Sequence, residues 1–399
     1  MRLARVEVTG QRQCWRADGT PIDDINSPDA QGQDGSVQAG IPYPRSGRFR
    51  INSNGTVTDR LTRLIWLQDA NAFGALQWDE ALEAVRTRTA GGADDWRLPN
   101  VKELQSLVDF GFHYPAVPNA AGSSKCTDGN PFVGLAGGRV YWSSTTSTGD
   151  FLIGHPDDHP PPLDKAWGVD LDTGSTTPKF RTGERDRVAT KFHVLPVRGP
   201  DPADAVRPAG VEVTGKTECW DGERLTGCGR SVAEGQDGAI EEGVPYPNPR
   251  FRDGGDGTVT DRLTGLIWLK DANPFATKTW QEALNAVNGL NVGGAEDWRL
   301  PNVKELQSLI DFGRANLETR SLATPRSSVP PLALPCGHPF DFVKSRVYWS
   351  STTVVSRPEE AWFVSLRFGT THFSGSADSA TKAEKRGVWA VRGGRTRKR

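Results

Sequence analysis

Hydrophobic residues recur with helical spacing in two places in each half of the chain. In the second half, the first predicted helix covers 279–291, where Thr279 and Glu282 have the spacing of a capping box. Its buried face consists of Trp280, Ala283, Leu284 and Val287. The pattern predicts an amphipathic helix that packs one face against the core of a domain.

A second helix is predicted after the sequence "RLPN" at 97–100. Pro99 ends an extended segment, Asn100 caps the helix and Glu103 stands at the capping-box position. The buried stripe of this helix consists of Val101, Leu104, Leu107 and Val108. We expect Gly111, and its counterpart Gly313, to end the helix in the left-handed conformation that glycine tolerates best.

Short runs with β character surround the helices. The sequence "TVTDRLTGLIWLK" (258–270) reads as two strands broken by a polar turn, and "VYWSSTT" (347–353) reads as one strand. The sequences "AWFVSLRFG" (361–369) and "GVWAVRGG" (387–394) alternate as half-buried strands do. We therefore expect an α+β fold in which two helices pack on one side of a mainly antiparallel sheet with long loops.

The whole pattern is present twice. The stretch "DDWRLPNVKELQSLVDFG" (94–111) returns as "EDWRLPNVKELQSLIDFG" (296–313). We predict a first copy over 1–199, a linker over 200–210 and a second copy over 211–399. The loops that differ between the copies, about 113–164 and 314–360, are the places where we expect function to lie.

Twelve of the 13 tryptophans occupy matched positions in the two copies. The pairs are Trp15 with Trp220, Trp66 with Trp268, Trp78 with Trp280, Trp96 with Trp298, Trp142 with Trp349, and Trp167 with Trp362, and Trp389 is unmatched. Large rings shared by copies with different loops are better explained as core residues than as sugar-binding platforms.

Composition narrows the possible functions. The chain of 399 residues has 48 basic and 49 acidic side chains, so it presents no broad field for nucleic acid or an anionic membrane. No stretch approaches the roughly 20 apolar residues of a membrane span. We expect a solvated role for the terminal "RTRKR" (395–399) rather than contact with a polyanion. The start "MRLARVEVTG" lacks the apolar region of a signal peptide, so we expect any leader to be missing from this sequence.

Three groups of polar residues are candidates for ligand or metal contacts. Asp253, Asp256 and Asp261 suggest a calcium loop, although a tight hairpin turn is the favoured interpretation. The candidate ligand residues of the long loops are His155, Asp157, Asp158, His159, Arg320 and Arg326. For the histidine-containing loop, a transition-metal site is chemically feasible, and a solvated loop is favoured.

The arginine of "DWRLPN" also has two interpretations. Arg97 and Arg299 could bind a carboxylate or sulfate of a ligand, but a structural ion pair with Asp95, Glu103 or their repeats is favoured.

Five cysteines leave an odd one. Cys219 and Cys228 flank a short loop that a disulfide could close, and we predict this bridge, which would imply an oxidising compartment. The state of the other three, Cys14, Cys126 and Cys336, stays open.

Five ordered motifs per copy, which include "DGTVTDRLTGLIWLKDAN", "DWRLPNVKELQSL" and "YWSSTT", resemble those of the Lcl C-terminal domain family. The resemblance covers both halves and implies a C-type lectin-like fold, usually on exported bacterial proteins, with adhesion to glycans or surfaces as the family precedent. The sequence has "WSS" where a calcium-dependent lectin has "WND", so calcium chelation of sugar is not supported.

No nucleophile elbow, phosphate loop, zinc-spaced cluster or pair of active-site cysteines is present in the sequence, so we expect a non-enzyme without a cofactor, with calcium only weakly supported. The expected function is recognition of a glycan or surface polymer by an exported, extracellular or surface-bound protein, with the periplasm as second choice. The alternative is a structural subunit of an extracellular fibre or oligomer that uses the same loops. A metal-dependent enzyme that uses the loop at 154–162 is the third and least favoured hypothesis.

Overall fold

A computed structural model defines the fold. It describes residues 6–135, 139–147, 165–181, 190–200, 210–221, 225–228, 234–314, 333–343, 347–366, 370–372 and 381–393. Among the helices in these ranges, none combines the length and hydrophobicity that crossing a bilayer requires.

The described elements follow the same order in the two halves. The first half contains β1 (Cys14–Trp15), β2 (Pro21–Ile22), η1 (Pro28–Ala30), α1 (Asp34–Val37), β3 (Phe49–Ile51), β4 (Thr56–Asp59), β5 (Ile65–Leu67), β6 (Ala75–Leu76), α2 (Trp78–Arg86), α3 (Val101–Leu107), β7 (Val140–Thr146), β8 (Lys165–Asp170), β9 (Thr176–Phe180), β10 (Phe192–His193) and β11 (Val197–Arg198). The second half contains β12 (Glu218–Trp220), β13 (Leu225–Gly227), α4 (Asp237–Ile240), β14 (Phe251–Asp253), β15 (Thr258–Asp261), β16 (Ile267–Leu269), β17 (Thr277–Lys278), α5 (Trp280–Asn288), α6 (Val303–Ser308), β18 (Val347–Thr353), β19 (Ala361–Ser365), β20 (Thr370–His372), β21 (Arg386–Gly387) and β22 (Val391–Arg392).

One sheet runs through both halves of the molecule. Its described strands have the order β17-β21-β18-β19-β20-β9-β8-β7-β10-β6. The two halves join where β20 pairs antiparallel with β9, with Thr371 opposite Thr176. Two smaller antiparallel sheets, β11-β5-β4-β3 and β14-β15-β16-β22, accompany it, one in each half. The α+β class and the mainly antiparallel pairing predicted from the sequence are therefore confirmed.

The predicted helices form with their predicted caps. In α5, Thr279 and Glu282 make both hydrogen bonds of the capping box, and the four residues of the predicted face are buried. In α3, Asn100 accepts a hydrogen bond from the backbone of Glu103, and all seven residues of the helix are buried. The sequence suggested only a one-sided stripe because it gave no sign that a second copy covers the other face. The short helices α1 and α4 were also not predicted.

The prediction for the end of α3 was wrong. The helix ends at Leu107, because Val108 is already extended with φ −69° and ψ 129°. Gly111 does not take the left-handed conformation expected of it. A Cβ at Gly111 would lie 2.6 Å from the carbonyl oxygen of Gly10, and one at Gly313 would lie 2.3 Å from that of Gly215. These glycines therefore allow close approach between two backbones.

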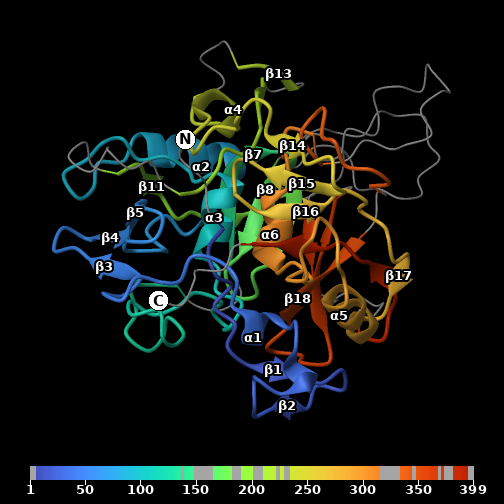
Figure 1. Ribbon diagram of the computed structural model, residues 1–399. Helices are drawn as coiled ribbons and strands as arrows, with labels where there is room; N and C mark the ends of the chain where they lie inside the picture. The colour runs from blue at the N-terminus through green and yellow to red at the C-terminus, as the bar shows by residue number, and fades with distance from the viewer. Residues whose placement is uncertain are drawn as a thin grey trace, which may run out of the picture.

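The segment that precedes each small sheet crosses to the opposite copy. We call residues 6–44 arm one and the described part of 211–246 arm two, and residues 49–198 and 251–392 core one and core two. In Figure 1, α1, β1 and β2 of arm one lie beside α5 and β18 of core two. In the same view, α4 of arm two lies beside α2 and β7 of core one. Each arm thus packs on the core of the other copy, which we call the exchange of arms, while it keeps contacts with its own core, such as the hydrogen bond from Phe110 N to Thr9 O at 2.7 Å.

Hydrogen bonds connect arm one to core two. The side chain of Gln11 donates to the backbone oxygen of Thr353 at 2.8 Å and accepts from its backbone nitrogen at 2.9 Å. The hydroxyl of Thr352 donates to Asp34 Oδ2 at 2.7 Å, and the amide of Asn302 donates to the carbonyl oxygen of Ala39 at 3.1 Å. Asp34 is buried, so this contact is enclosed within the protein.

Arm two repeats two of these contacts on core one. The hydroxyl of Thr145 donates to the buried Asp237 Oδ2 at 2.7 Å. The amide of Asn100 donates to the carbonyl oxygen of Glu242 at 3.1 Å. Asn100 therefore caps α3, Asn302 caps α6, and each of them also binds the arm of the other copy.

The tryptophans form the core, as predicted. The following have less than 2 % of their surface exposed: Trp66, Trp78, Trp142, Trp167, Trp268, Trp280, Trp349 and Trp389. Trp220 is only half-buried, and its ring stacks with the guanidinium of Arg181 at 4.4 Å. The unmatched Trp389 fills core two against Trp268, at 5.2 Å between ring centroids.

The predicted disulfide joins Cys219 and Cys228, the ends of the hairpin formed by β12 and β13. The corresponding hairpin of arm one, β1 with β2, has no such bridge, and Cys14 is a buried free thiol. Cys126 is likewise buried and free, whereas the free Cys336 is exposed.

We expect Cys228→Ser to lower the free energy of unfolding by about 2–3 kcal/mol, because it removes a crosslink between residues 9 positions apart. Urea unfolding of the full chain, with and without reductant, measures this effect. Reductant should destabilise the wild type and leave the variant unchanged. Equal stability of the two proteins without reductant would contradict the prediction.

Candidate functional site

The repeated motif "DWRLPNVKEL" builds a buried structural ion pair. The guanidinium of Arg299 donates to both carboxylate oxygens of Glu305, at 2.7 and 2.5 Å. Glu305 also accepts the backbone N–H of Asn302 at 2.9 Å, so it caps α6 as well. Arg97 and Glu103 make the same pair in core one. The favoured structural interpretation of these arginines is therefore confirmed, with Glu103 and Glu305 as the partners.

The structure does not bring the three aspartates of the acidic turn together. Asp261 is fully buried and paired with Arg250 at 2.9 Å. Asp253 pairs with Lys270 at 2.8 Å, and this hydrogen bond lowers the pKa of the Asp253 carboxyl. The loop between β14 and β15 is a hairpin turn, as favoured. No group of three potential metal ligands occurs in the described ranges.

The other predicted ligand residues fall in the long loops. These are His155, Asp157, Asp158, His159, Arg320 and Arg326, which lie outside the described residues.

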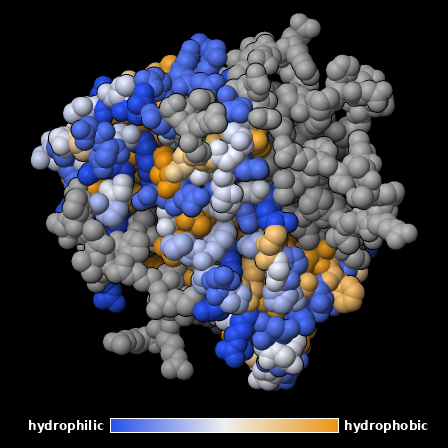
Figure 2. Space-filling model, turned by 90° about the horizontal axis from the view of Figure 1, so that it is seen from above, coloured by the Kyte–Doolittle hydropathy of each residue, from blue (hydrophilic) through white to orange (hydrophobic). Residues whose placement is uncertain are grey.

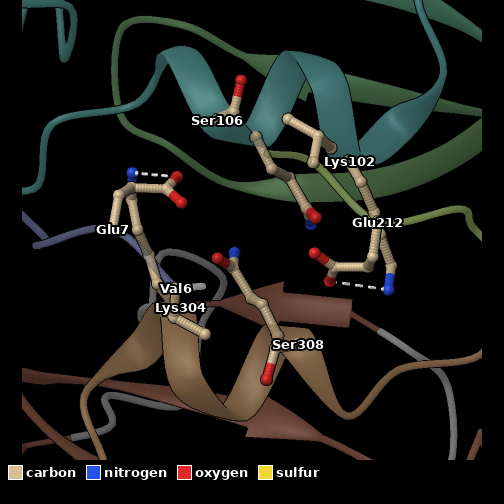
Figure 3. Close-up of a pocket in the computed structure, with 10 residues that line it drawn as sticks. Val6, Glu7, Lys102, Ser106, Glu212, Lys304 and Ser308 are labelled. Atoms are coloured by element: carbon tan, nitrogen blue, oxygen red, sulfur yellow. Dashed lines mark hydrogen bonds and ion pairs between the residues drawn. The ribbon is translucent and has the colours of Figure 1, made fainter. Parts of the chain in front are cut away.

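A small polar cavity lies between α3 and α6, where the two copies meet. Figure 3 shows the two helices facing each other across it, with one ion pair on each side. Lys102 of core one binds Glu212 of arm two at 2.9 Å, and Lys304 of core two binds Glu7 of arm one at 2.8 Å. Each pair thus fixes the arm of one copy to the helix of the other.

The cavity is too small to be a binding site for a sugar. Its volume of about 40 Å³ has room for only a few water molecules. Burial lowers the pKa of Lys102 and of Lys304, whereas the neighbouring glutamates oppose that shift. Because each lysine is almost fully buried beside a carboxylate, the pairs serve to fix the arms rather than to bind a ligand.

A larger groove opens at the surface between arm one and core two. Its volume is about 580 Å³, within the range of small-molecule sites. The buried ring of Trp298 lies beneath it, and Gln31, Asn288, Glu296, Asp297 and Arg392 contribute polar side chains to its walls. The exchange of arms creates this groove, because one wall belongs to arm one and the others to core two.

Most of the polar side chains in the groove keep unused hydrogen-bonding capacity. Asp297 Oδ1 accepts from Arg392 Nε at 2.8 Å, and Glu296 Oε1 accepts from Asn291 at 3.2 Å. Asn288 donates to the backbone oxygen of Gln31 at 3.4 Å. Within the described part of the chain, the side-chain amide of Gln31 and the second oxygens of Asp297 and Glu296 have no protein partner. The groove therefore offers both donors and acceptors to a ligand.

The corresponding place on the other copy has a different rim. Arg86 and Glu234, which align with Asn288 and Gln31, form an ion pair at 3.1 Å. Arg86 also binds Glu83 at 2.8 Å. The ion pair below the rim is the same in both copies, since Arg198 pairs with Asp95 at 2.7 Å in core one and Arg392 pairs with Asp297 at 2.8 Å in core two. The two copies thus differ in the charge and length of the side chains at the rim.

Two aromatic side chains project from the loops that differ between the copies. Tyr114 is 59 % exposed at φ 48°, and Phe342 is 71 % exposed at φ 52°. Hydrogen bonds anchor the backbone beside both rings, from Tyr114 to Asp172 at 2.9 Å and from Asp341 to Lys270 at 2.9 Å. On the face seen in Figure 2, hydrophobic residues form separate patches among hydrophilic ones.

Sequence reasoning missed the groove and the two exposed rings. The rings lie within the loop regions that we predicted to be functional, but no periodicity distinguished them. The groove depends on an arm from the other copy, so only the difference between Gln31 with Asn288 and Glu234 with Arg86 could have pointed to it.

Comparison with known families agrees with the internal repeat. The model of the Lcl C-terminal domain matches residues 55–198 and again 257–392. No curated protein matches the chain, and no solved structure does. The matched ranges coincide with core one and core two and leave out both arms. The chain belongs to the Lcl C-terminal domain family, of which it carries two copies in tandem.

Proposed function

We propose that this protein is a non-catalytic recognition protein that binds a glycan or surface polymer through its long loops, on a frame of the C-type lectin-like kind. The observation that carries the proposal is the display of Tyr114 and Phe342, two largely exposed aromatic side chains in left-handed backbone. A bulky residue at positive φ destabilises the fold by roughly 1–3 kcal/mol. An exposed ring makes few contacts within the fold that could offset this destabilisation.

The position of the rings supports this role. Of the large exposed hydrophobic residues in the described part, Tyr114, Val133 and Phe342 belong to the long loops, whereas Ile51 lies on β3. Copy one has Gly134 where copy two has Phe342, so the frame itself does not require the ring. An exposed aromatic face can stack on the apolar face of a sugar, and this contact is available on rigid backbone.

We further propose that the protein is exported and acts outside the cell or at its surface, with the periplasm as the second choice. The disulfide between Cys219 and Cys228 supports an oxidising compartment.

The test is retention of the full-length protein on immobilised glycans. We expect the Tyr114→Asn/Phe342→Gly double variant to lose about 1–2 kcal/mol of binding, roughly a five- to thirty-fold loss of affinity. Asn and Gly suit the left-handed backbone at these positions, so the fold should be retained. Ile51→Ala, which removes an exposed hydrophobic side chain outside the loops, is the control and should bind as the wild type does.

Light scattering separates this function from the alternative of a fibre or oligomer subunit. A monomer whose glycan retention depends on the two rings supports the proposal. Large assemblies that dissociate in the double variant, without any glycan retention, would replace it with the structural role.

A further inference from the structure

We infer that the groove between arm one and core two is a saccharide subsite, selective for neutral or basic sugars over sulfated ones. The inference rests on the proposed recognition function and adds to it a second contact site, away from Tyr114 and Phe342. Three observations lead to it: the size of the groove, its uncommitted hydrogen-bonding groups and its charge.

The size and composition fit a short stretch of polysaccharide. A groove of about 580 Å³ has room for more than one sugar ring, whereas the central cavity of about 40 Å³ has none. The wall that carries Glu296 and Asp297 is fixed from below, since the neighbouring Trp298 is buried and donates to the carbonyl of Val292 at 3.1 Å. Such fixed polar groups reduce the ordering cost of binding.

The hydrogen-bonding groups suit hydroxyl ligands. A sugar hydroxyl both donates and accepts, so it is best satisfied between a carboxylate or amide oxygen and an N–H group. Asp297 and Glu296 each leave one carboxylate oxygen without a protein partner, and Gln31 provides an amide on the opposite wall. Asn288 is half-buried between these walls and makes only one weak hydrogen bond, at 3.4 Å.

Gly32 brings the two walls together. A Cβ at this position, where φ is +79°, would lie 2.8 Å from Asn288 Oδ1. The absence of a side chain therefore allows arm one to lie directly against the end of α5. On the other copy, a Cβ at Gly235 would meet only Leu82 at 3.4 Å, so the close approach to a polar side chain is specific to the groove.

The charge of the groove decides which sugars it favours. Glu296 and Asp297 provide two negative charges, and Arg392 provides one positive charge that Asp297 already binds. Arg299, which lies below, is neutralised by Glu305. The net negative charge would repel a sulfate or carboxylate group, whereas neutral and amino sugars meet no such repulsion.

The two copies provide a matched pair of variants. Gln31→Glu/Asn288→Arg gives the groove the charged rim of the other copy, where Arg86 and Glu234 form an ion pair at 3.1 Å. Arg86→Asn/Glu234→Gln makes the reverse change on copy one. Three of these side chains are exposed and Asn288 is half-buried, so we expect both variants to stay folded, with melting temperatures close to that of the wild type.

Calorimetric titration of the full-length protein with chitohexaose, maltohexaose and a heparin hexasaccharide tests the inference. We expect a neutral hexasaccharide to bind, and the Gln31→Glu/Asn288→Arg variant to bind it about tenfold more weakly. The reverse variant should bind it within about twofold of the wild type, and heparin should not compete. A second variant, Asp297→Asn, should also weaken binding, which guards against an effect of the larger rim side chains alone.

Two results would overturn the inference. One is binding of a neutral hexasaccharide that neither Gln31→Glu/Asn288→Arg nor Asp297→Asn changes. The other is binding of heparin alone. In either case, loss of glycan retention in the Tyr114→Asn/Phe342→Gly variant would leave the proposed function standing, so the two failures are distinguishable. If no glycan is retained under any condition, both fall together.

Discussion

Arg250→Met should lower the free energy of unfolding by about 3–5 kcal/mol, because it leaves the Asp261 carboxylate buried without its cation. The guanidinium binds both oxygens of Asp261, at 3.1 and 2.9 Å, and donates to the carbonyl oxygen of Ser308 at 2.7 Å. The two side chains are 3 % and 0 % exposed, so water cannot replace the lost contacts. Urea unfolding monitored by tryptophan fluorescence measures the change.

Two further variants show why Arg250→Met lowers the free energy of unfolding. Lys270→Met removes a surface ion pair with Asp253 of the same small sheet, where solvent screens the charges, and should cost far less than Arg250→Met. Arg250→Met/Asp261→Asn removes the unpaired charge and should recover part of the stability. If the single and double variants were equally unstable, the penalty would come from lost packing rather than from the buried charge.

We expect the free energy of unfolding of the Asp34→Asn/Asp237→Asn variant to fall less than that of the wild type as pH rises from 4 to 8. Burial raises the pKa of both carboxyls from 3.8 to about 6, although hydrogen bonds from two threonines to each oppose the shift. Glu305 also raises the pKa of Asp34 and Arg299 lowers it, as Glu103 and Arg97 do for Asp237. Both carboxyls therefore bind a proton more tightly in the folded protein than in the unfolded chain.

The sign of the effect follows from that preference. The stabilising contribution of each carboxyl is complete below pH of about 4 and is lost as pH rises through about 6. A shift of about two units corresponds to about 3 kcal/mol for each site. An asparagine oxygen still accepts hydrogen bonds from the threonines and does not ionise, so the difference between variant and wild type should grow with pH.

Urea unfolding at intervals from pH 4 to pH 8 provides the comparison. Asp297→Asn, at an exposed carboxyl, is the control and should follow the wild-type curve. Parallel curves for the double variant and the wild type would show that the carboxyls do not titrate in this range. If the variant instead becomes more stable than the wild type as pH rises, ionisation of the two buried carboxyls destabilises the wild type.

The local structure was predictable from the sequence because its determinants are local. The capping boxes at Asn100 and Thr279 and the buried face of α5 depend on residues three or four positions apart. The hairpin of β14 and β15 depends on its turn residues, and the tryptophan core was evident from the matched pairs. The end of α3 was mispredicted because Gly111 meets Gly10, a contact that helix signals do not encode.

The exchange of arms could not be predicted from the sequence, for a physical reason. The arms are similar to each other and so are the cores, so that Asp34 has equivalent threonines available in both copies. The contact that forms, with Thr352, joins residues 318 positions apart. Whether an arm packs on its own core or on the other depends on small differences in packing and on the length of the linker. The same reason applies to the groove, because the arm makes one of its walls.

The C-type lectin-like frame stays a proposal that rests on motif order. The structure shows the coarser class, a tandem α+β domain with one continuous sheet across the β9–β20 pair.

The exchanged arms also determine how the particle responds to dilution. If the contacts between arm and core joined two separate chains, their formation would be a bimolecular reaction with a concentration below which the pair separates. In the tandem chain both arms are tethered, and each core meets its partner at an effective concentration set by the chain itself. Because arm and core belong to one chain, their pairing is a first-order step, and dilution leaves it unchanged.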